Sequence, residues 1–201
     1  MKIAVIGATG MVGSRVVAEA SKRGHVVDAY SRGGTMVQGA ETALPLDLAD
    51  TAAVAEAIGA HDATVITVVS GRTGSYADDV ANHRALIEAA PSGRFLVVGG
   101  AGALQADERT LLKDTPGFPA EYKPEADAFS EVYEAYRGSE GLEWTMLAPA
   151  PVIAPGERTG EYSTGDDRPA GESISAEDFA VALVDELERP AHAGRRFTAA
   201  N

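Results

Sequence analysis

The sequence contains no cysteine among its 201 residues. This absence excludes disulfide bonds, thiolate metal sites and cysteine nucleophiles, and it fits a reducing compartment. The four histidines, at positions 25, 61, 83 and 192, are too scattered for their spacing to predict a metal site. We therefore expect no metal.

Basic residues are in the minority, because 17 Lys and Arg stand against 30 Asp and Glu and leave a formal charge of -13. Such a charge repels phosphate backbones and anionic lipid surfaces, so we expect neither nucleic acid nor membrane as a partner. No apolar run reaches membrane-spanning length, and Met1 and Lys2 lead directly into a strand-like apolar run. We therefore expect no signal peptide and a cytoplasmic protein.

Short apolar runs alternate with helical patterns along the chain. We expect strands at residues 2–6, 25–30, 42–46, 63–69, 94–98, 142–147 and 196–199. We expect helices to begin near residues 11, 50, 76, 124 and 175. This alternation predicts an α/β fold with a doubly wound parallel sheet, in one domain covering residues 1–201. Prolines at 149, 151 and 155 predict a loop, and we interpret residues 150–175 as a lobe that covers the site.

A glycine-rich string, GATGMVG at 7–13, joins the first expected strand to the first expected helix. In this context Gly7 allows a sharp turn, Gly10 allows the backbone to approach a pyrophosphate, and Gly13 allows close helix packing. The free amides at the helix start favour an anion. The alternative is a tight turn without a ligand.

Ser31 and Arg32 stand at the end of the second expected strand, where an acidic residue would bind the ribose hydroxyls of NAD. A guanidinium pairs well with a 2'-phosphate, so these residues favour NADP(H) over NAD(H) as the cofactor. The alternative for Arg32 is a solvated loop residue. Asp47 either faces the adenine amino group or serves as an acid at a helix start. The predicted cofactor contacts are Gly7, Ala8, Thr9, Gly10, Met11, Val12, Gly13, Ser31, Arg32, Asp47, Leu48, Val69, Ser70, Gly71, Gly99 and Gly100.

Several motifs in this order give the chain a family resemblance over nearly its whole length. They are GATGMVG at 7–13, VVGGAGAL at 97–104, GLEWTMLAP at 141–149, PGERTGEY at 155–162, SISAEDFAVALVDELE at 173–188 and RRFT at 195–198. With them the chain resembles an atypical short-chain dehydrogenase/reductase, close to the NAD(P)H-binding proteins called NADH-flavin reductases and to the NmrA-like group. The resemblance implies a Rossmann-like fold and NAD(P) binding. It is much less specific for a reaction.

The resemblance also implies where a catalytic set would lie. The position that matches the family's catalytic tyrosine is Tyr122, and the lysine expected four residues later is Ala126. The usual serine after the fifth strand is replaced by GGAG. A tyrosine without a nearby cation is a poor general acid at neutral pH, which argues against alcohol or sugar oxidoreduction by the usual mechanism.

Flavin reduction needs no obligatory side-chain acid, because a hydride passes to N5 of a ring held face to face with the nicotinamide. Such a site needs a flat apolar slot, and the glycines at 99, 100 and 102 either leave room for a ring or form a plain turn. The predicted pocket for this small-molecule acceptor is formed by Arg72, Ala101, Pro149, Pro151, Val152, Arg158 and Tyr162.

These observations favour an NADP(H)-dependent reductase of a flavin or a similar flat acceptor, acting as a monomer or homodimer. The alternative is a non-catalytic NADP-binding regulator that senses redox state, and an unusual isomerase or epimerase is a third possibility. His83 lies on an apolar helix stripe and is interpreted as a packed residue.

Overall fold

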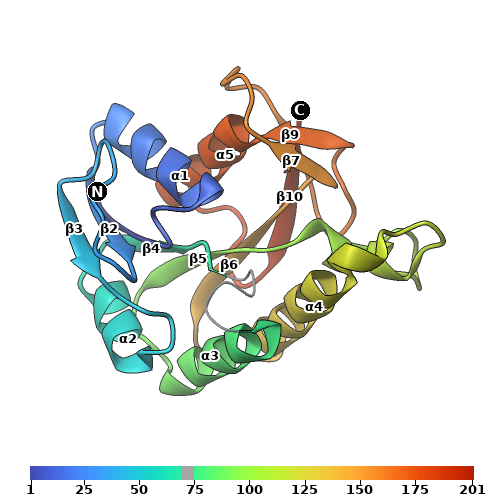
Figure 1. Ribbon diagram of the computed structural model, residues 1–201, viewed down its shortest axis with the longest axis horizontal. Helices are drawn as coiled ribbons and strands as arrows, with labels where there is room; N and C mark the ends of the chain where they lie inside the picture. Colours follow the sequence, from blue (N-terminus) through green and yellow to red (C-terminus); the bar gives the residue numbers. More distant parts are fainter. Residues whose placement is uncertain (69–74) are drawn as a thin grey trace.

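A central sheet of eight strands forms the middle layer of the computed structural model, which describes residues 1–68 and 75–201 (Figure 1). The strands are β1 (Lys2–Ile6), β2 (Val26–Ser31), β3 (Thr42–Pro45), β4 (Ala63–Ile66), β5 (Arg94–Val98), β6 (Glu143–Pro149), β8 (Ser163–Gly165) and β10 (Arg196–Ala200). Their order is β3-β2-β1-β4-β5-β6-β10-β8, and only β10 and β8 pair antiparallel. The predicted doubly wound α/β fold is therefore confirmed, with an additional edge strand, β8.

The direction of strand order reverses at β1. The chain builds outward from β1 to β2 and β3, and then returns to place β4 on the other side of β1. Ile3 of β1 accordingly pairs with Val27 of β2 on one side and with Ala63 of β4 on the other. In such sheets a ligand binds beyond the carboxyl ends of the strands at the reversal. The turns after β1 and β4 therefore mark the expected crevice.

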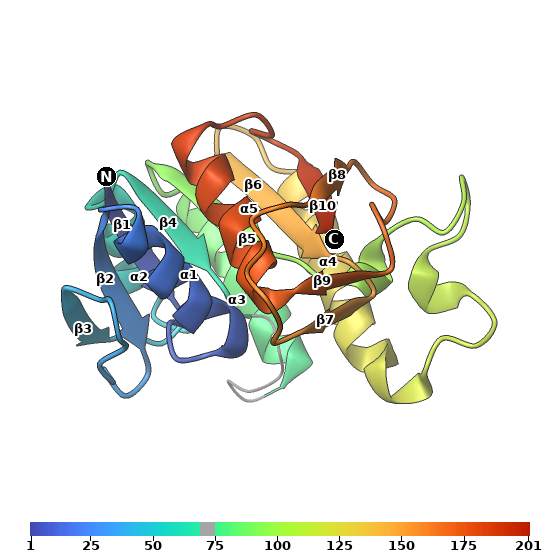
Figure 2. The same ribbon diagram turned by 90° about the horizontal axis from the view of Figure 1, so that it is seen from above.

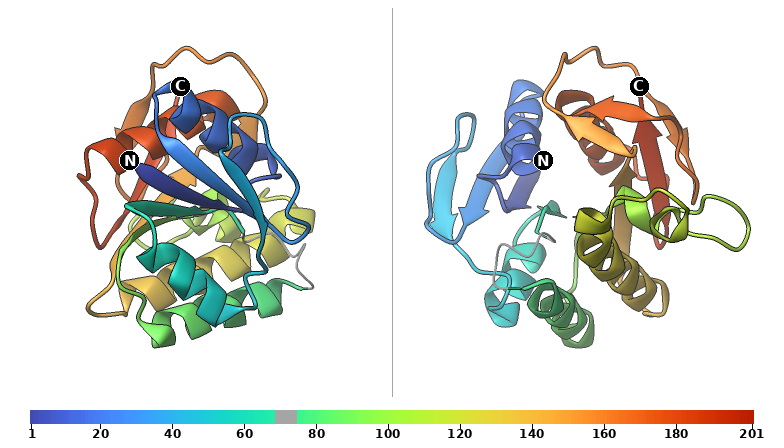
Figure 3. Two further views of the ribbon diagram at one scale, coloured as in Figure 1. Left: turned by 90° about the vertical axis from the view of Figure 1, so that its left-hand side faces the viewer. Right: turned by 45° about the vertical axis from the view of Figure 1, so that its right-hand side comes forward.

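Helices cover both faces of the sheet (Figures 2 and 3). On one face α1 (Met11–Lys22) lies beside α5 (Ala176–Glu188), and on the other lie α2 (Thr51–Gly59), α3 (Tyr76–Ala89) and α4 (Lys123–Arg137). Ile3 and Val5 pack in the core under the first pair, whereas Ile6 packs in the core under the other three. This division explains why β1 is apolar at successive positions. In the described part of the chain, no helix has the length and apolar character needed to cross a membrane.

Residues 150–175 are more regular than the predicted loop. β7 (Val152–Ala154) and β9 (Ser173–Ser175) form a separate parallel pair, and β8 extends the main sheet beside β10. The prolines do not prevent this, because Pro149 ends β6 while Pro151 and Pro155 flank β7. A proline removes only its own N–H donor, so a three-residue strand fits between two of them.

Residues 155–162 form a strap that is fastened to α1 and α5. The Arg158 guanidinium donates to the buried Glu19 carboxylate of α1 at 2.7 and 2.6 Å. The Tyr162 hydroxyl donates to Asp185 of α5 at 2.6 Å, and the Gly160 N–H donates to Asp178 at 2.7 Å. The hydrogen bond from Arg158, supported by Arg23, lowers the pKa of Glu19 to about 2.

Glu19→Gln should lower the free energy of unfolding at pH 7 by about 1.5–3 kcal/mol, because it removes a charge-assisted hydrogen-bond acceptor. The pKa of Glu19 in the folded chain, about 2, lies below its ordinary value of 4.5. The carboxylate therefore stabilises the fold above the ordinary value and loses this contribution as the pH falls toward 2. Urea unfolding across this pH range should show the difference between wild type and Glu19→Gln shrinking on acidification.

The matched control is Glu161→Gln, because Glu161 is an exposed acid on the same strap and its hydrogen bonds to described residues involve only its backbone. It should change stability by less than about 0.5 kcal/mol. A Glu19→Gln difference that is independent of pH would contradict the ion-pair explanation.

Candidate functional site

The turn between β1 and α1 contacts the end of β2 on one side and the residues after β4 on the other. Gly7 has a φ of 88°, and a side chain there would lie 2.4 Å from the Thr67 hydroxyl. The N–H groups of Gly7 and Ala8 both donate to the Tyr30 carbonyl, at 2.9 and 3.0 Å. The prediction that Gly7 allows a sharp turn is confirmed, since L side chains rarely adopt this conformation.

Gly13 and Gly10 lack side chains for different reasons. A Cβ at Gly13 would lie 2.2 Å from the Gly7 carbonyl oxygen, which confirms the predicted close packing and shows that the helix packs against the turn itself. A Cβ at Gly10 would meet only that same oxygen, at 3.3 Å, among the described residues. This single contact is tight, but no other described atom lies within 4 Å, so the space beside Gly10 is otherwise open to a closely approaching ligand.

The start of α1 is suited to an anion. Gly10 is its N-cap, no side chain caps it, and its first turn carries no acidic residue. The unpaired amides of a first turn and the partial positive charge of the helix attract phosphate. Around this turn Thr9 and Met11 are exposed, Val12 is half-buried and Ala8 is buried.

Ser31 and Arg32 follow the turn on the neighbouring strand. Ser31 is buried, and its hydroxyl oxygen accepts the Thr35 N–H at 3.1 Å, which leaves the hydroxyl hydrogen available as a donor. Arg32 is exposed, and its guanidinium has no hydrogen-bond or ion-pair partner among the described residues. The end of β2 therefore carries a hydroxyl and, one residue later, a cation that no described residue pairs with.

Asp47 and Leu48 follow β3. The half-buried Asp47 carboxylate accepts the Ala49 N–H at 3.0 Å, and the cap of α2 is instead Asp50. Leu48 is buried in the core under α2. A contact between Asp47 and adenine stays a prediction.

Thr67 and Val68 follow β4 and lie directly against the glycine turn. The Thr67 hydroxyl oxygen is 3.0 Å from the Ile6 carbonyl oxygen and 3.1 Å from that of Gly7. Thr67 is not predictable as a site residue from the sequence, because a threonine at the end of a strand carries no ligand-binding signal. We predicted instead Val69, Ser70, Gly71 and Arg72, which lie outside the described residues.

His83 is a packed residue, as predicted. It is fully buried on α3 and lies within hydrogen-bond distance of the Val68 carbonyl, 3.1 Å, and of the Tyr136 hydroxyl, 2.9 Å. Burial lowers its pKa to about 4, so the ring is neutral near pH 7. Because a carbonyl oxygen only accepts, Nε2 donates to Val68 and Nδ1 accepts from Tyr136.

The glycines after β5 make room for the protein rather than for a ligand ring. A Cβ at Gly100 would lie 2.2 Å from the Phe129 ring, and one at Gly102 would lie 2.5 Å from the Ala126 Cβ. A Cβ at Gly99 would lie 3.0 Å from the Met146 side chain. Our expectation that these glycines leave space for a ring is therefore wrong. They allow α4 and β6 to approach the turn, which includes the short helix η1 (Ala101–Ala103).

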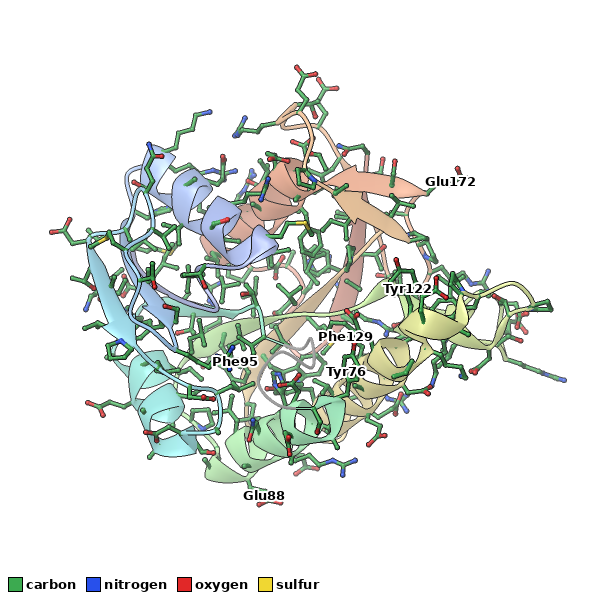
Figure 4. All side chains as sticks on the ribbon, viewed as in Figure 1. Tyr76, Glu88, Phe95, Tyr122, Phe129 and Glu172 are labelled. Carbon is green, nitrogen blue, oxygen red and sulfur yellow. The ribbon has the colours of Figure 1, made fainter. Side chains whose placement is uncertain are left out.

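Tyr122 lies immediately before α4, with 58% of its surface exposed and no hydrogen-bond partner for its phenol among the described residues (Figure 4). Ala126, at the position where the family resemblance implies a lysine, is buried against Gly102. The adjacent Lys123 pairs with Asp114 at 3.2 Å and Asp127 at 3.5 Å. These residues provide no cation that would activate the tyrosine.

The other predicted pocket residues divide into two groups. Pro149 is buried, Pro151 is exposed, and Val152 has an exposed fraction of 59%, directly after the carboxyl end of β6. Arg158 and Tyr162 instead contact Glu19 and Asp185, in the second halves of α1 and α5. The structure therefore brings Val152, but not Arg158 or Tyr162, to the edge where the glycine turn lies.

Comparisons with known proteins agree with this arrangement. The model of a family described as NAD(P)H-binding matches residues 7–190. The uncharacterized protein YwnB of Bacillus subtilis is 41% identical, over 98% of this chain and 97% of its own length.

Solved structures of similar proteins cover the whole chain. A Streptococcus pneumoniae protein named a "putative NADH-flavin reductase" has 35% identity and a TM-score of 0.87, over 100% of this chain and 99% of its own. A Burkholderia pseudomallei protein named a "putative exported protein" has 40% identity and a TM-score of 0.88, over 100% of both chains. A Bacteroides thetaiotaomicron protein named a "putative epimerase" has 30% identity and a TM-score of 0.86, over 99% of this chain and 96% of its own.

Alanine substitutions at two glycines of this turn should have different effects. Gly10→Ala should leave the fold nearly unchanged but weaken NADPH binding about tenfold or more, because its methyl group fills the space left for a pyrophosphate. Gly13→Ala should instead lower the free energy of unfolding by about 1–3 kcal/mol, because its methyl group overlaps the Gly7 carbonyl. Urea unfolding and fluorescence titration with NADPH measure the two effects. Equal destabilisation by both variants would contradict this distinction.

Proposed function

Because this chain belongs to the NAD(P)H-binding family, we propose that it is an NADP(H)-preferring oxidoreductase that reduces a flavin or a similarly flat acceptor. The observation that carries the cofactor preference is the free guanidinium of Arg32 at the end of β2. In a chain with a net charge of -13, an arginine that has no acidic partner among the described residues suits a 2'-phosphate, which a guanidinium can bind through two hydrogen bonds.

The proposed cofactor would be held by residues of the glycine turn and of the neighbouring strand. The amides at the start of α1 would bind the pyrophosphate, while Arg32 and the Ser31 hydroxyl would bind the 2'-phosphate. The free space beside Gly10 supports this fit, because a side chain there would fill it. When bound, NADPH supplies a hydride, which together with one proton from water converts an oxidised flavin to its two-electron-reduced form.

The chain's own contribution to the reaction is positioning. Ala126 packs against Gly102 where the family resemblance implies a lysine, so position 126 provides no cation to assist the Tyr122 hydroxyl in proton transfer. Tyr122 and Val152 are exposed apolar side chains near the carboxyl edge of the sheet, and they suit the walls of a slot for a flat ring. Holding two rings face to face and excluding water needs no side-chain acid.

The same missing lysine supports a second candidate, a non-catalytic NADP-binding regulator. The two functions share the cofactor site and differ in turnover. The proposed partner of the reductase is a small-molecule acceptor, whereas the regulator would contact a partner protein. For either function we propose no nucleic acid or membrane, and a monomer or homodimer as the working unit. The proposed location is the cytoplasm.

Arg32→Ala should raise the Kd for NADPH about 10- to 100-fold, because it removes a charge-assisted contact to the 2'-phosphate, and it should change the Kd for NADH less than about twofold. Fluorescence titration with both nucleotides measures this. Arg109→Ala is the matched control, because Arg109 is another exposed arginine without a side-chain partner in the described part of the chain. An equal rise in the Kd for NADPH and for NADH would contradict a contact between Arg32 and the 2'-phosphate.

Tyr122→Phe should retain kcat for flavin reduction within about threefold, whereas loss of a general acid would cost about 100-fold or more. Tyr122→Ala should instead raise KM for the flavin, because it removes an aromatic wall. Steady-state NADPH oxidation with FMN as acceptor separates the two variants. A kcat loss in Tyr122→Phe as large as that expected for an acid would contradict a positional mechanism.

A further inference from the structure

Thr67 lies outside every strand and helix, yet its side chain contacts the centre of the glycine turn. Its hydroxyl oxygen is 3.0 Å from the Ile6 carbonyl oxygen and 3.1 Å from the Gly7 carbonyl oxygen. A hydroxyl has one hydrogen, so it donates to these two carbonyls alternately or shares the hydrogen between them. The Thr67 backbone N–H also donates to the Ile6 carbonyl, at 2.9 Å.

The Gly7 carbonyl is the group that shapes this turn. It accepts the Gly10 N–H at 3.0 Å, and it is the atom against which Gly13 packs. Its direction therefore determines where the backbone from Gly10 to Gly13 lies, including the amides at the start of α1. The Thr67 hydroxyl, which hydrogen-bonds to the Gly7 carbonyl, therefore also affects the position of the amides at the start of α1, although it does not contact them.

Thr67 is itself held in place from the opposite side. The carbonyl of the next residue, Val68, accepts a hydrogen bond from the buried His83 of α3 at 3.1 Å. His83 in turn accepts one from the Tyr136 hydroxyl of α4 at 2.9 Å. The backbone next to Thr67 is therefore hydrogen-bonded to α3 and, through His83, connected to α4.

Thr64 in the same segment shows that this chain does not need a partner for every buried threonine. Thr64 is fully buried in β4, and its hydroxyl has no hydrogen-bond partner within residues 1–68 and 75–201. The half-buried Thr67 hydroxyl, in contrast, lies within hydrogen-bond distance of two carbonyl oxygens, those of Ile6 and Gly7.

We propose that Thr67 is a positioning residue for the dinucleotide, whose hydroxyl fixes the Gly7 carbonyl and so aims the amides of the turn at the pyrophosphate. This inference rests on the proposed placement of the dinucleotide at the glycine turn. NADPH and NADH contain the same pyrophosphate, so the inference predicts the same effect on the binding of both. Loss of the hydroxyl must weaken both nucleotides by the same factor, unlike loss of Arg32.

The test is equilibrium titration of the full chain with NADPH and with NADH, followed by fluorescence. Thr67→Val, which keeps the shape but removes the hydroxyl, should raise both Kd values about three- to tenfold and leave their ratio unchanged. Thr67→Ser, which restores the hydroxyl, should return both to within about twofold of wild type. Thr64→Val makes the same chemical change three positions earlier and should alter neither Kd.

The outcomes separate this inference from the proposed function. If wild type binds neither nucleotide, the proposed function fails. If wild type binds and Thr67→Val binds equally well, the Thr67 inference alone is wrong. It is also wrong if Thr67→Ser is as weak as Thr67→Val, or if only one nucleotide is affected. Should Thr67→Val unfold, the Thr67→Ser titration still decides, because restored affinity in a folded protein supports the inference and a tenfold loss overturns it.

Discussion

The carbonyl oxygen of Gly7 accepts the Gly10 N–H at 3.0 Å, lies 3.1 Å from the Thr67 hydroxyl and leaves no space for a side chain at position 13. Through these contacts the end of β1, the end of β4 and the start of α1 are joined at one atom. The sheet reverses its strand order at the same place, so the rigid turn faces the crevice that the topology creates. Rigidity there reduces the entropy lost when a dinucleotide binds.

Close packing also explains why position 126 holds alanine and not lysine. Gly100 and Gly102 let α4 approach the turn after β5 until Phe129 and Ala126 fill the space beside them. A lysine at position 126, which the family resemblance implies, would have to displace this contact. The reaction that we propose for this site accordingly depends on orientation and on exclusion of water rather than on proton transfer by a side chain.

The parts of the fold with local signals were predictable from the sequence. The apolar run of β1, the spacing of Gly7, Gly10 and Gly13, and the caps of the later helices all depend on residues that are close in sequence. The strands within residues 150–175 were missed, because each has three residues and forms only when a distant partner is present. Arg158 and Tyr162 were assigned to a pocket because they occupy a polar loop, and only the structure reveals their partners on α1 and α5. Thr67 was missed for the same reason, since its role depends on a turn 60 residues away.

The most direct measurement of the central claim is the oxidation of NADPH and NADH by the purified protein, with FMN, FAD, riboflavin and a quinone offered in turn. The account predicts turnover well above background on at least one of these flat acceptors, with a higher kcat/KM for NADPH than for NADH. Tight NADPH binding without turnover on any acceptor would contradict the reductase and favour the regulator. Preference for NADH would contradict the role assigned to Arg32.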